Sequence, residues 1–185
     1  KKAESRVRET YIKASTAQKT KLYDPYVCFI RWASDRIGEE GMVALITNRS
    51  YLDSRQADGL RKSLTVEFQR IWIVDLMSDV RKNPKISGTK YNIFGIQTGV
   101  AIIFLVRDPK LEGCDIRYMA LDDFLPAEDK RRWLAAHTLE RLARNGELTR
   151  IEPNARGDWL NQPEHDWSSW LPVAYSNSEA TGCAG

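Results

Sequence analysis

Gly88-Thr89-Lys90-Tyr91-Asn92-Ile93-Phe94-Gly95-Ile96-Gln97-Thr98-Gly99, followed by Val100-Ala101-Ile102-Ile103-Phe104-Leu105-Val106, is the stretch that decides the fold. A polar, glycine-containing loop leads directly into an unbroken apolar strand. A strand without polar alternation must be covered on both faces, which predicts an α/β sheet layered with helices. The loop lies at the edge of that sheet, where such folds bind ligands. Phe94 is placed there to stack on a flat substrate; the alternative is that it caps the core.

Helices and strands alternate in the sequence before this stretch. Pro25 suits the first turn of a helix, and Met42 to Thr47 and Ile71 to Val74 read as short buried strands, the first of them parallel. Asp53, with Gln56 three residues on, resembles the N-terminal cap of a second helix. The inward residues expected on the two helices are Tyr26, Phe29, Ile30, Ala33 and Ile37, then Leu60, Leu64 and Phe68.

The strand at 71–74 and the strand at 100–106 have no helix between them, so we expect them to pair antiparallel. The sequence divides into a basic linker or loose helix (1–21), an α/β region (22–108), a second small region (109–175) and a disordered tail (176–185). In the second region we expect a strand at 116–119 and a helix at 126–144, whose inward residues are Trp133, Ala136, Leu139 and Ala143. Beyond Gly146, Trp159, Trp167 and Trp170 indicate an irregular segment packed by aromatic rings.

Charge and cysteine content exclude several classes of protein. The net charge of +3 over 185 residues is too small for a global nucleic-acid-binding field, but the basic residues Lys82, Lys85 and Lys90 flank the Phe94 loop. They are candidate phosphate contacts, and a solvated surface is the alternative. Three scattered cysteines show no metal or disulfide spacing, which predicts a reducing cytoplasm and no metal. No apolar run is long enough to span a membrane. The chain starts without Met, so we expect a piece of a longer polypeptide.

Several ordered motifs between residues 6 and 172 resemble the methyltransferase region of single-polypeptide Type ISP restriction-modification enzymes. The matching stretches are 8–11, 22–24, 31–37, 46–53, 75–76, 80–84, 92–100 and 155–160. The order of these motifs along the chain also resembles that in the second half of adenine-N6 DNA methyltransferases. The resemblance implies the Rossmann-like sheet of an S-adenosylmethionine-dependent methyltransferase, of which this chain supplies the last three strands, one reversed, plus a small α+β appendage. It also implies that residues 22–108 are the C-terminal half of the methyltransferase domain and that 109–175 begin a target-recognition or connecting region. The family's Asn-Pro-Pro-Tyr motif and glycine-rich cofactor loop are absent from the sequence, so we expect no catalytic residue here and no activity from this chain alone.

The resemblance also assigns roles to residues. Phe94 matches the family's aromatic residue before the seventh strand and is expected to stack on an extruded base. Tyr23, Asp24 and Tyr26 are expected in the wall of the cofactor pocket, with a helix cap and core aromatics as the alternative. Asn48 and Ser50 end the fifth strand, facing the cleft, with ordinary turn chemistry as the alternative. Double-stranded DNA and the remainder of the parent polypeptide, with its nuclease and ATPase regions, are the implied partners.

Two functions other than adenine methylation remain open from the sequence. The first is a non-catalytic DNA-binding or coupling module that keeps the fold. The second is a methyltransferase that acts on RNA or protein, because the fold alone does not fix the substrate. The residues that precede Lys1 in the parent would distinguish these readings, since an Asn-Pro-Pro-Tyr motif there favours adenine methylation.

Overall fold

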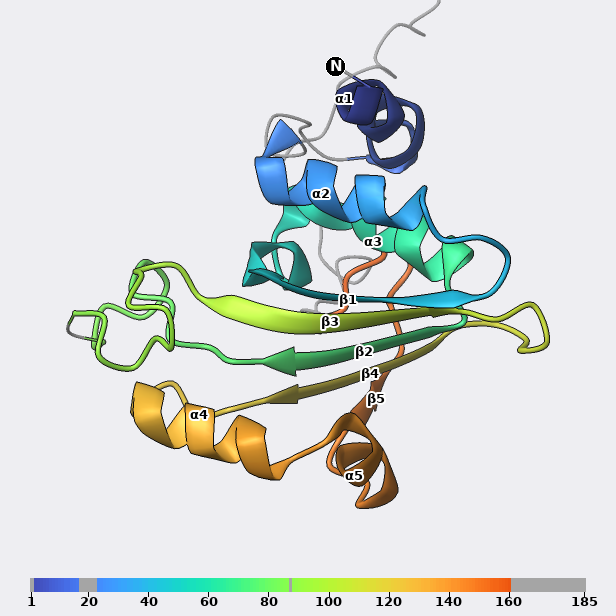
Figure 1. Cartoon of the computed structure of the whole chain (residues 1–185). Helices are drawn as coiled ribbons and strands as arrows, with labels where there is room; N and C mark the ends of the chain where they lie inside the picture. The colour runs from blue at the N-terminus through green and yellow to red at the C-terminus, as the bar shows by residue number, and fades with distance from the viewer. Residues whose placement is uncertain (1, 17–22, 87, 161–185) are drawn as a thin grey trace, which may run out of the picture.

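A five-stranded mixed sheet forms the centre of the computed structural model, which describes residues 2–16, 23–86 and 88–160 (Figure 1). Its order is β1-β3-β2-β4-β5. The strands are β1 (Gly41–Asn48), β2 (Arg70–Asp75), β3 (Val100–Arg107), β4 (Asp115–Ala120) and β5 (Thr149–Ile151). The α/β class is therefore confirmed, and the four longer strands lie where the sequence predicted strands.

The apolar strand β3 lies between β1 and β2 and runs antiparallel to both. The predicted antiparallel pairing of β2 with β3 is confirmed, with Ile73 opposite Ile103. β4 pairs parallel with β2, and β5 antiparallel with β4. The prediction of a parallel β1 was wrong for its pairing in the described sheet, because β3 returns beside it in the opposite direction. β4 also extends the same sheet, so the sheet continues across residue 108, where the second region was expected to begin.

One face of the sheet is covered by α2 (Pro25–Ser34) and α3 (Asp58–Glu67), and α1 (Lys2–Val7) packs on α2 on the side away from the sheet (Figure 1). Ala101, Ile103 and Leu105 of β3 point toward this layer and are fully buried. The N-terminal segment, expected as a loose helix or linker, packs on the layer: Val7 and Tyr11 have no exposed surface. Tyr11 belongs to a π-helical turn, Arg8–Ile12, that follows α1.

Two predictions about these helices were wrong. Phe29 was expected to point inward, but its side chain is half exposed because α2 turns Val27, Ile30 and Ala33 toward the sheet instead. Asp53 was expected to cap the second helix, which begins only at Asp58 after two short 3-10 turns. Asp53 instead forms ion pairs with neighbouring cationic side chains. Leu60, Leu64 and Phe68 are fully buried, as predicted.

The opposite face is covered by α4 (Ala127–Ala136) and α5 (Leu139–Arg144) (Figure 1). A single helix over 126–144 was predicted, but it is broken at His137, whose backbone is extended. Thr138 then starts α5, its hydroxyl oxygen accepting a hydrogen bond from the Arg141 amide at 3.3 Å. Because of this break Ala136 is exposed, and the buried residue of α5 is Leu142.

The last described residues are fixed by a buried arginine. Arg61 of α3, 1% exposed, donates to the carbonyl oxygen of Gly157 and to Asp158 Oδ1, both at 2.8 Å. Trp159 is buried and meets the Tyr51 ring edge-on, which agrees with the expected packing by aromatic rings. Trp167, Trp170 and the tail 176–185 lie outside the described residues. Within the described ranges, no helix is long and apolar enough to cross a membrane.

Candidate functional site

An apolar cleft of about 630 Å³ opens where β1 ends and β3 begins. Its walls come from the first turns of α2, the end of β1, the loop before β3 and the first residue of β3. The lining residues are Pro25, Tyr26, Phe29, Ile46, Thr47, Asn48, Phe94 and Val100. The volume is within the usual range for small-molecule sites, which are mostly apolar with a few polar groups. The polar side chains here are those of Tyr26, Thr47 and Asn48.

Phe94 contributes its ring to this cleft from the loop between β2 and β3. The side chain is 51% exposed, so the core is not what holds it. Its backbone amide donates to Asn92 Oδ1 at 2.9 Å, which fixes the loop from inside. The structure therefore places the ring at an open cleft beside the first residue of β3.

Two further aromatic residues, Tyr26 and Phe29, line the same cleft. Burial raises the pKa of the Tyr26 hydroxyl, with the carboxylates of Asp24 and Asp53 acting in the same direction. Phe29 was missed as a site residue because the sequence pattern assigned it to the buried stripe of α2. The only sequence signal for Phe29 was its spacing, about one helical turn after Pro25 and Tyr26. The structure shows that all three residues line the cleft.

The remaining predicted site residues divide between the cleft and its surroundings. Asn48 lines the cleft, and its Oδ1 accepts the Ser50 amide at 2.8 Å, so the turn chemistry considered as the alternative is present as well. Asp24, Tyr26 and Ser50 line a smaller adjoining cavity of about 100 Å³. Tyr23 is 43% exposed and lines neither space.

A buried ion pair that sequence reasoning missed supports this end of the sheet. Arg49, directly after β1, donates from Nε and Nη2 to the carboxylate of Asp75 at the end of β2, at 2.8–2.9 Å. Asp75 has no exposed surface and also accepts the Tyr118 hydroxyl at 3.0 Å. Burial alone would lower the pKa of Arg49, but pairing with Asp75 and Asp53 raises it. A Cβ on Gly99 would lie 2.5 Å from Arg49 Cδ, so only glycine fits there.

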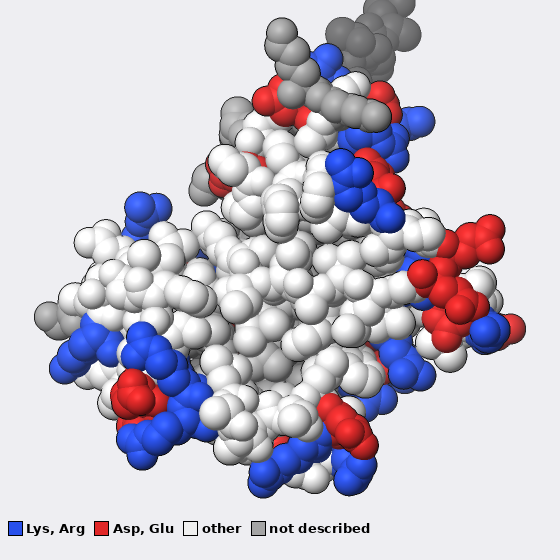
Figure 2. Space-filling view, in the orientation of Figure 1, with Lys and Arg blue, Asp and Glu red and all other residues white. Residues whose placement is uncertain are grey.

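The candidate phosphate contacts Lys82, Lys85 and Lys90 lie on the surface of the loop between β2 and β3. Lys82 is ion-paired with Asp53, and the Lys90 ammonium lies 4.7 Å from the centre of the Tyr91 ring. Figure 2 shows basic side chains, with some acidic ones among them, over α4 and the neighbouring loop between β2 and β3. The centre of the same face, over β1 and β3, carries no charge (Figure 2).

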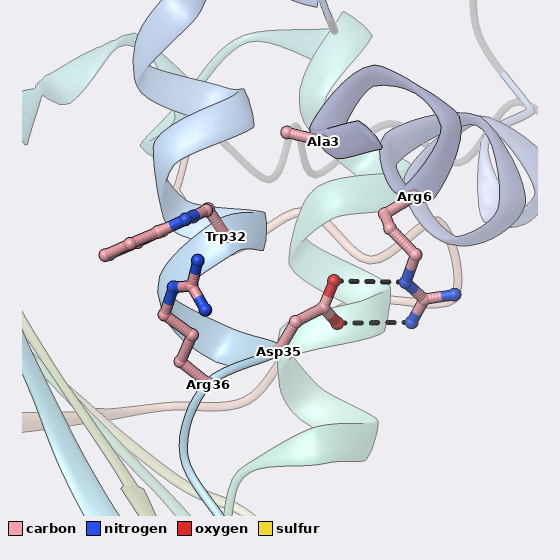
Figure 3. A pocket seen from close by; sticks show the side chains of 5 residues that line it. All are labelled: Ala3, Arg6, Trp32, Asp35 and Arg36. Atoms are coloured by element: carbon pink, nitrogen blue, oxygen red, sulfur yellow. Dashed lines mark hydrogen bonds and ion pairs between the residues drawn. The ribbon is translucent and has the colours of Figure 1, made fainter. Parts of the chain in front are cut away.

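A separate cavity of about 490 Å³ lies between α1 and α2 (Figure 3). Across it, Arg6 donates to both carboxylate oxygens of Asp35, at 3.0 and 3.1 Å. The Arg36 guanidinium covers the Trp32 ring at 4.1 Å from its centre. Arg6 and Asp35 are paired with each other, Arg36 lies over the Trp32 ring, and none of the predicted site residues lines this cavity, so the cleft beside Phe94 is the better candidate. The described part of the chain holds no group of side chains suited to bind a metal.

Solved structures similar to this chain carry DNA. A structure described as a DrdV–DNA complex is 39% identical and covers 93% of this chain, with a TM-score of 0.75. The ATP-dependent Type ISP restriction-modification enzyme LlaBIII bound to DNA is 31% identical over 95% of the chain, with a TM-score of 0.83. A nuclease-deletion mutant of the Type ISP enzyme LlaGI with a DNA substrate mimic is 33% identical over 96%, with a TM-score of 0.81.

These similarities confirm the resemblance to Type ISP restriction-modification enzymes that the sequence motifs indicated. The chain spans only 12–17% of the length of those three proteins. No family model and no curated protein matches it.

Proposed function

We propose that this chain, similar over nearly its whole length to a segment of the Type ISP enzymes, is part of a site-specific adenine-N6 DNA methyltransferase. In this role it supplies one wall of the cleft that receives an adenine extruded from duplex DNA. The observation that carries the proposal is the half-exposed Phe94 ring in an apolar cleft at the edge of the sheet.

The chemistry of adenine methylation explains why such a cleft is needed. The exocyclic amine of adenine lies inside the duplex, so the base must leave the stack before a methyl group can reach it. The extruded base loses its stacking on both sides, and an aromatic side chain restores about 1–3 kcal/mol of it. Phe94 is exposed enough to do this, and the apolar walls formed by Tyr26, Phe29 and Ile46 exclude water from the other parts of the base.

S-adenosylmethionine is the proposed methyl donor, and it brings an electrophilic methyl group on a sulfonium. The cavity lined by Asp24, Tyr26 and Ser50 holds only about 100 Å³, which is too small for the whole cofactor. These residues therefore fit one side of its pocket, where the Asp24 carboxylate favours a cation. The remainder of the pocket, like the catalytic motif, has to come from another part of the parent enzyme. Methyl transfer then depends on how closely the two parts align donor and acceptor.

The outer edge of β1 supports a partner segment within the parent. β1 has a strand neighbour on one side only in the described sheet. Its sequence, Gly41 to Asn48, contains no charge and no proline, the usual protections of an exposed edge. Met42 and Ile46 are also more than half exposed. We infer that the remainder of the parent methyltransferase covers this edge, which would complete the Rossmann-like sheet.

Methylation by the parent enzyme tests the proposal. The parent is incubated with radiolabelled S-adenosylmethionine and duplex DNA, and the DNA is digested to nucleosides. We expect label in N6-methyl-2′-deoxyadenosine. No label on adenine N6 would refute the proposal. In parallel incubations with RNA or protein in place of DNA, label there would favour a methyltransferase of another substrate class. DNA binding without any transfer would favour a coupling module. The isolated chain is expected to show no turnover and no micromolar cofactor binding by calorimetry.

A further inference from the structure

The loop that carries Phe94 is organised around one buried amide side chain, that of Asn92. Asn92 is 4% exposed. Its Oδ1 accepts the Phe94 amide at 2.9 Å, and its Nδ2 donates to the Thr98 carbonyl oxygen at 2.9 Å. The Asn92 backbone takes part as well, since its carbonyl oxygen accepts the Gly95 amide at 3.0 Å. One side chain therefore bridges the two sides of the loop that carries the ring.

Contacts outside the loop fix its base. The Ala127 amide donates to the Lys90 carbonyl oxygen at 3.1 Å, and Arg131 Nη2 of α4 donates to the Ile93 carbonyl oxygen at 2.7 Å. On the other side of Phe94, the Gln97 carbonyl oxygen accepts a hydrogen bond from the Val80 amide at 2.9 Å. The segment on both sides of Phe94 is thus anchored, while the side chain itself is half exposed at the cleft. Such an arrangement sets the position of the ring without burying it.

We propose that Asn92 is the positioning residue for Phe94, which it holds at the cleft before any ligand arrives. A ring on an unrestrained loop would have to be ordered when the base binds, and this ordering opposes binding. A ring already held in place avoids that loss, as preorganised sites do. The role of the ring toward an extruded adenine rests on the proposed function. The positioning of the ring by Asn92 rests on the geometry of the loop alone.

The two hydrogen bonds of Asn92 can be separated by substitution. Asn92→Asp is nearly isosteric and keeps an oxygen for the Phe94 amide, but it loses the donor to Thr98 and places a second oxygen against that carbonyl. Asn92→Ala removes both bonds. A matched control is Asn154, which has the same kind of role in a distant turn. Its Oδ1 accepts the amides of Arg156 and Asp158, at 3.0 and 2.9 Å.

Fluorine NMR reads the position of the ring independently of any activity. Trifluoromethylphenylalanine is incorporated at position 94 of the chain, and the spectrum is recorded in the wild-type, Asn92→Ala, Asn92→Asp and Asn154→Ala backgrounds. Circular dichroism confirms the fold of each. We expect one narrow resonance in the wild-type and Asn154→Ala proteins, and a broadened or split resonance in both Asn92 variants. An unchanged narrow resonance in folded Asn92→Ala would overturn the proposal.

A double-mutant cycle in the parent enzyme tests the consequence for methylation. Asn92→Ala is expected to lower kcat/KM about tenfold when Phe94 is present, and to have little further effect when residue 94 is alanine, because it acts through the ring. Equal losses in both backgrounds would show an independent structural role and contradict the proposal. If the parent transfers no methyl group to DNA, the proposed function fails, whereas the fluorine spectra still decide whether Asn92 positions the ring.

Discussion

Removal of the buried guanidinium of Arg49 is predicted to destabilise the chain strongly. Arg49→Met keeps most of the aliphatic volume but leaves the carboxylate of Asp75, which has no exposed surface, without its cation. Only the Tyr118 hydroxyl and the Met77 amide then remain among its donors in the described structure. Breaking a buried pair on one side typically costs about 3–5 kcal/mol. That is a large part of the free energy of unfolding of a typical domain, which is about 5–15 kcal/mol.

Urea unfolding followed by far-UV circular dichroism measures this effect. With a slope of about 2 kcal/mol per molar urea, the midpoint of Arg49→Met should fall by about 1.5–2.5 M. The matched control is Arg6→Met at the pair with Asp35, where the Arg6 side chain is 41% exposed. Solvent screens that pair, so its loss should cost less than about 1 kcal/mol. The double variant Arg49→Met, Asp75→Asn should regain part of the loss because no buried charge is left unpaired.

The result that would refute this reasoning is a small or equal effect. If Arg49→Met and Arg6→Met lower the urea midpoint by the same amount, burial does not determine the cost of the broken pair. If the double variant is no more stable than Arg49→Met, the unpaired charge of Asp75 is not the cause of the loss.

Two further predictions concern pH and thiol chemistry. Burial would raise the pKa of Asp58, but hydrogen bonds from Ser15 and Thr16 lower it overall; the stability that this carboxylate contributes is therefore present above the ordinary aspartate value and is lost as pH falls through its lower folded pKa. Urea midpoints measured from pH 7 to pH 3 should fall more for the wild type than for Asp58→Asn, and parallel curves would contradict this. Burial raises the pKa of the Cys114 thiol to about 11. With the other two cysteines replaced by serine, its reaction with a disulfide reagent at pH 8 should be at least about tenfold slower in the native chain than in urea; equal rates would show that the thiol is not shielded.

The fold could be predicted where local sequence determines it. The run of apolar residues from Val100 to Val106 fits only a strand covered on both faces, and the absence of a helix between it and β2 favoured an antiparallel pair. The orientation of α2 could not be predicted in the same way. Phe29 and Ile30 are equally apolar, and only the position of the sheet decides which of them is buried. The helix after Asp53 began late because Asp53 is engaged by Arg49 and Lys82.

The candidate site was predicted in part for a similar reason. Phe94 could be located because its loop directly precedes β3, the strand that begins at the cleft. The pairing of Arg49 with Asp75 joins residues 26 positions apart, and nothing in the local sequence of either indicates it. Asn92 begins the matching stretch 92–100, but its role depends on how the loop closes over its side chain. Residues that position other residues therefore emerged only from the three-dimensional structure.

The measurement that tests the central claim most directly compares Phe94→Ala with the wild type in the parent enzyme. The rate of adenine methylation and the affinity for DNA of unrelated sequence are measured side by side, with Val66→Ala, an exposed residue of α3, as control. The loss of one stacking contact worth about 1–3 kcal/mol corresponds to about a 5- to 150-fold lower kcat/KM. We expect this loss for Phe94→Ala, with non-specific DNA affinity nearly unchanged and Val66→Ala like the wild type. Equal loss of methylation and non-specific binding in Phe94→Ala would contradict the account and leave the ring with a structural role only.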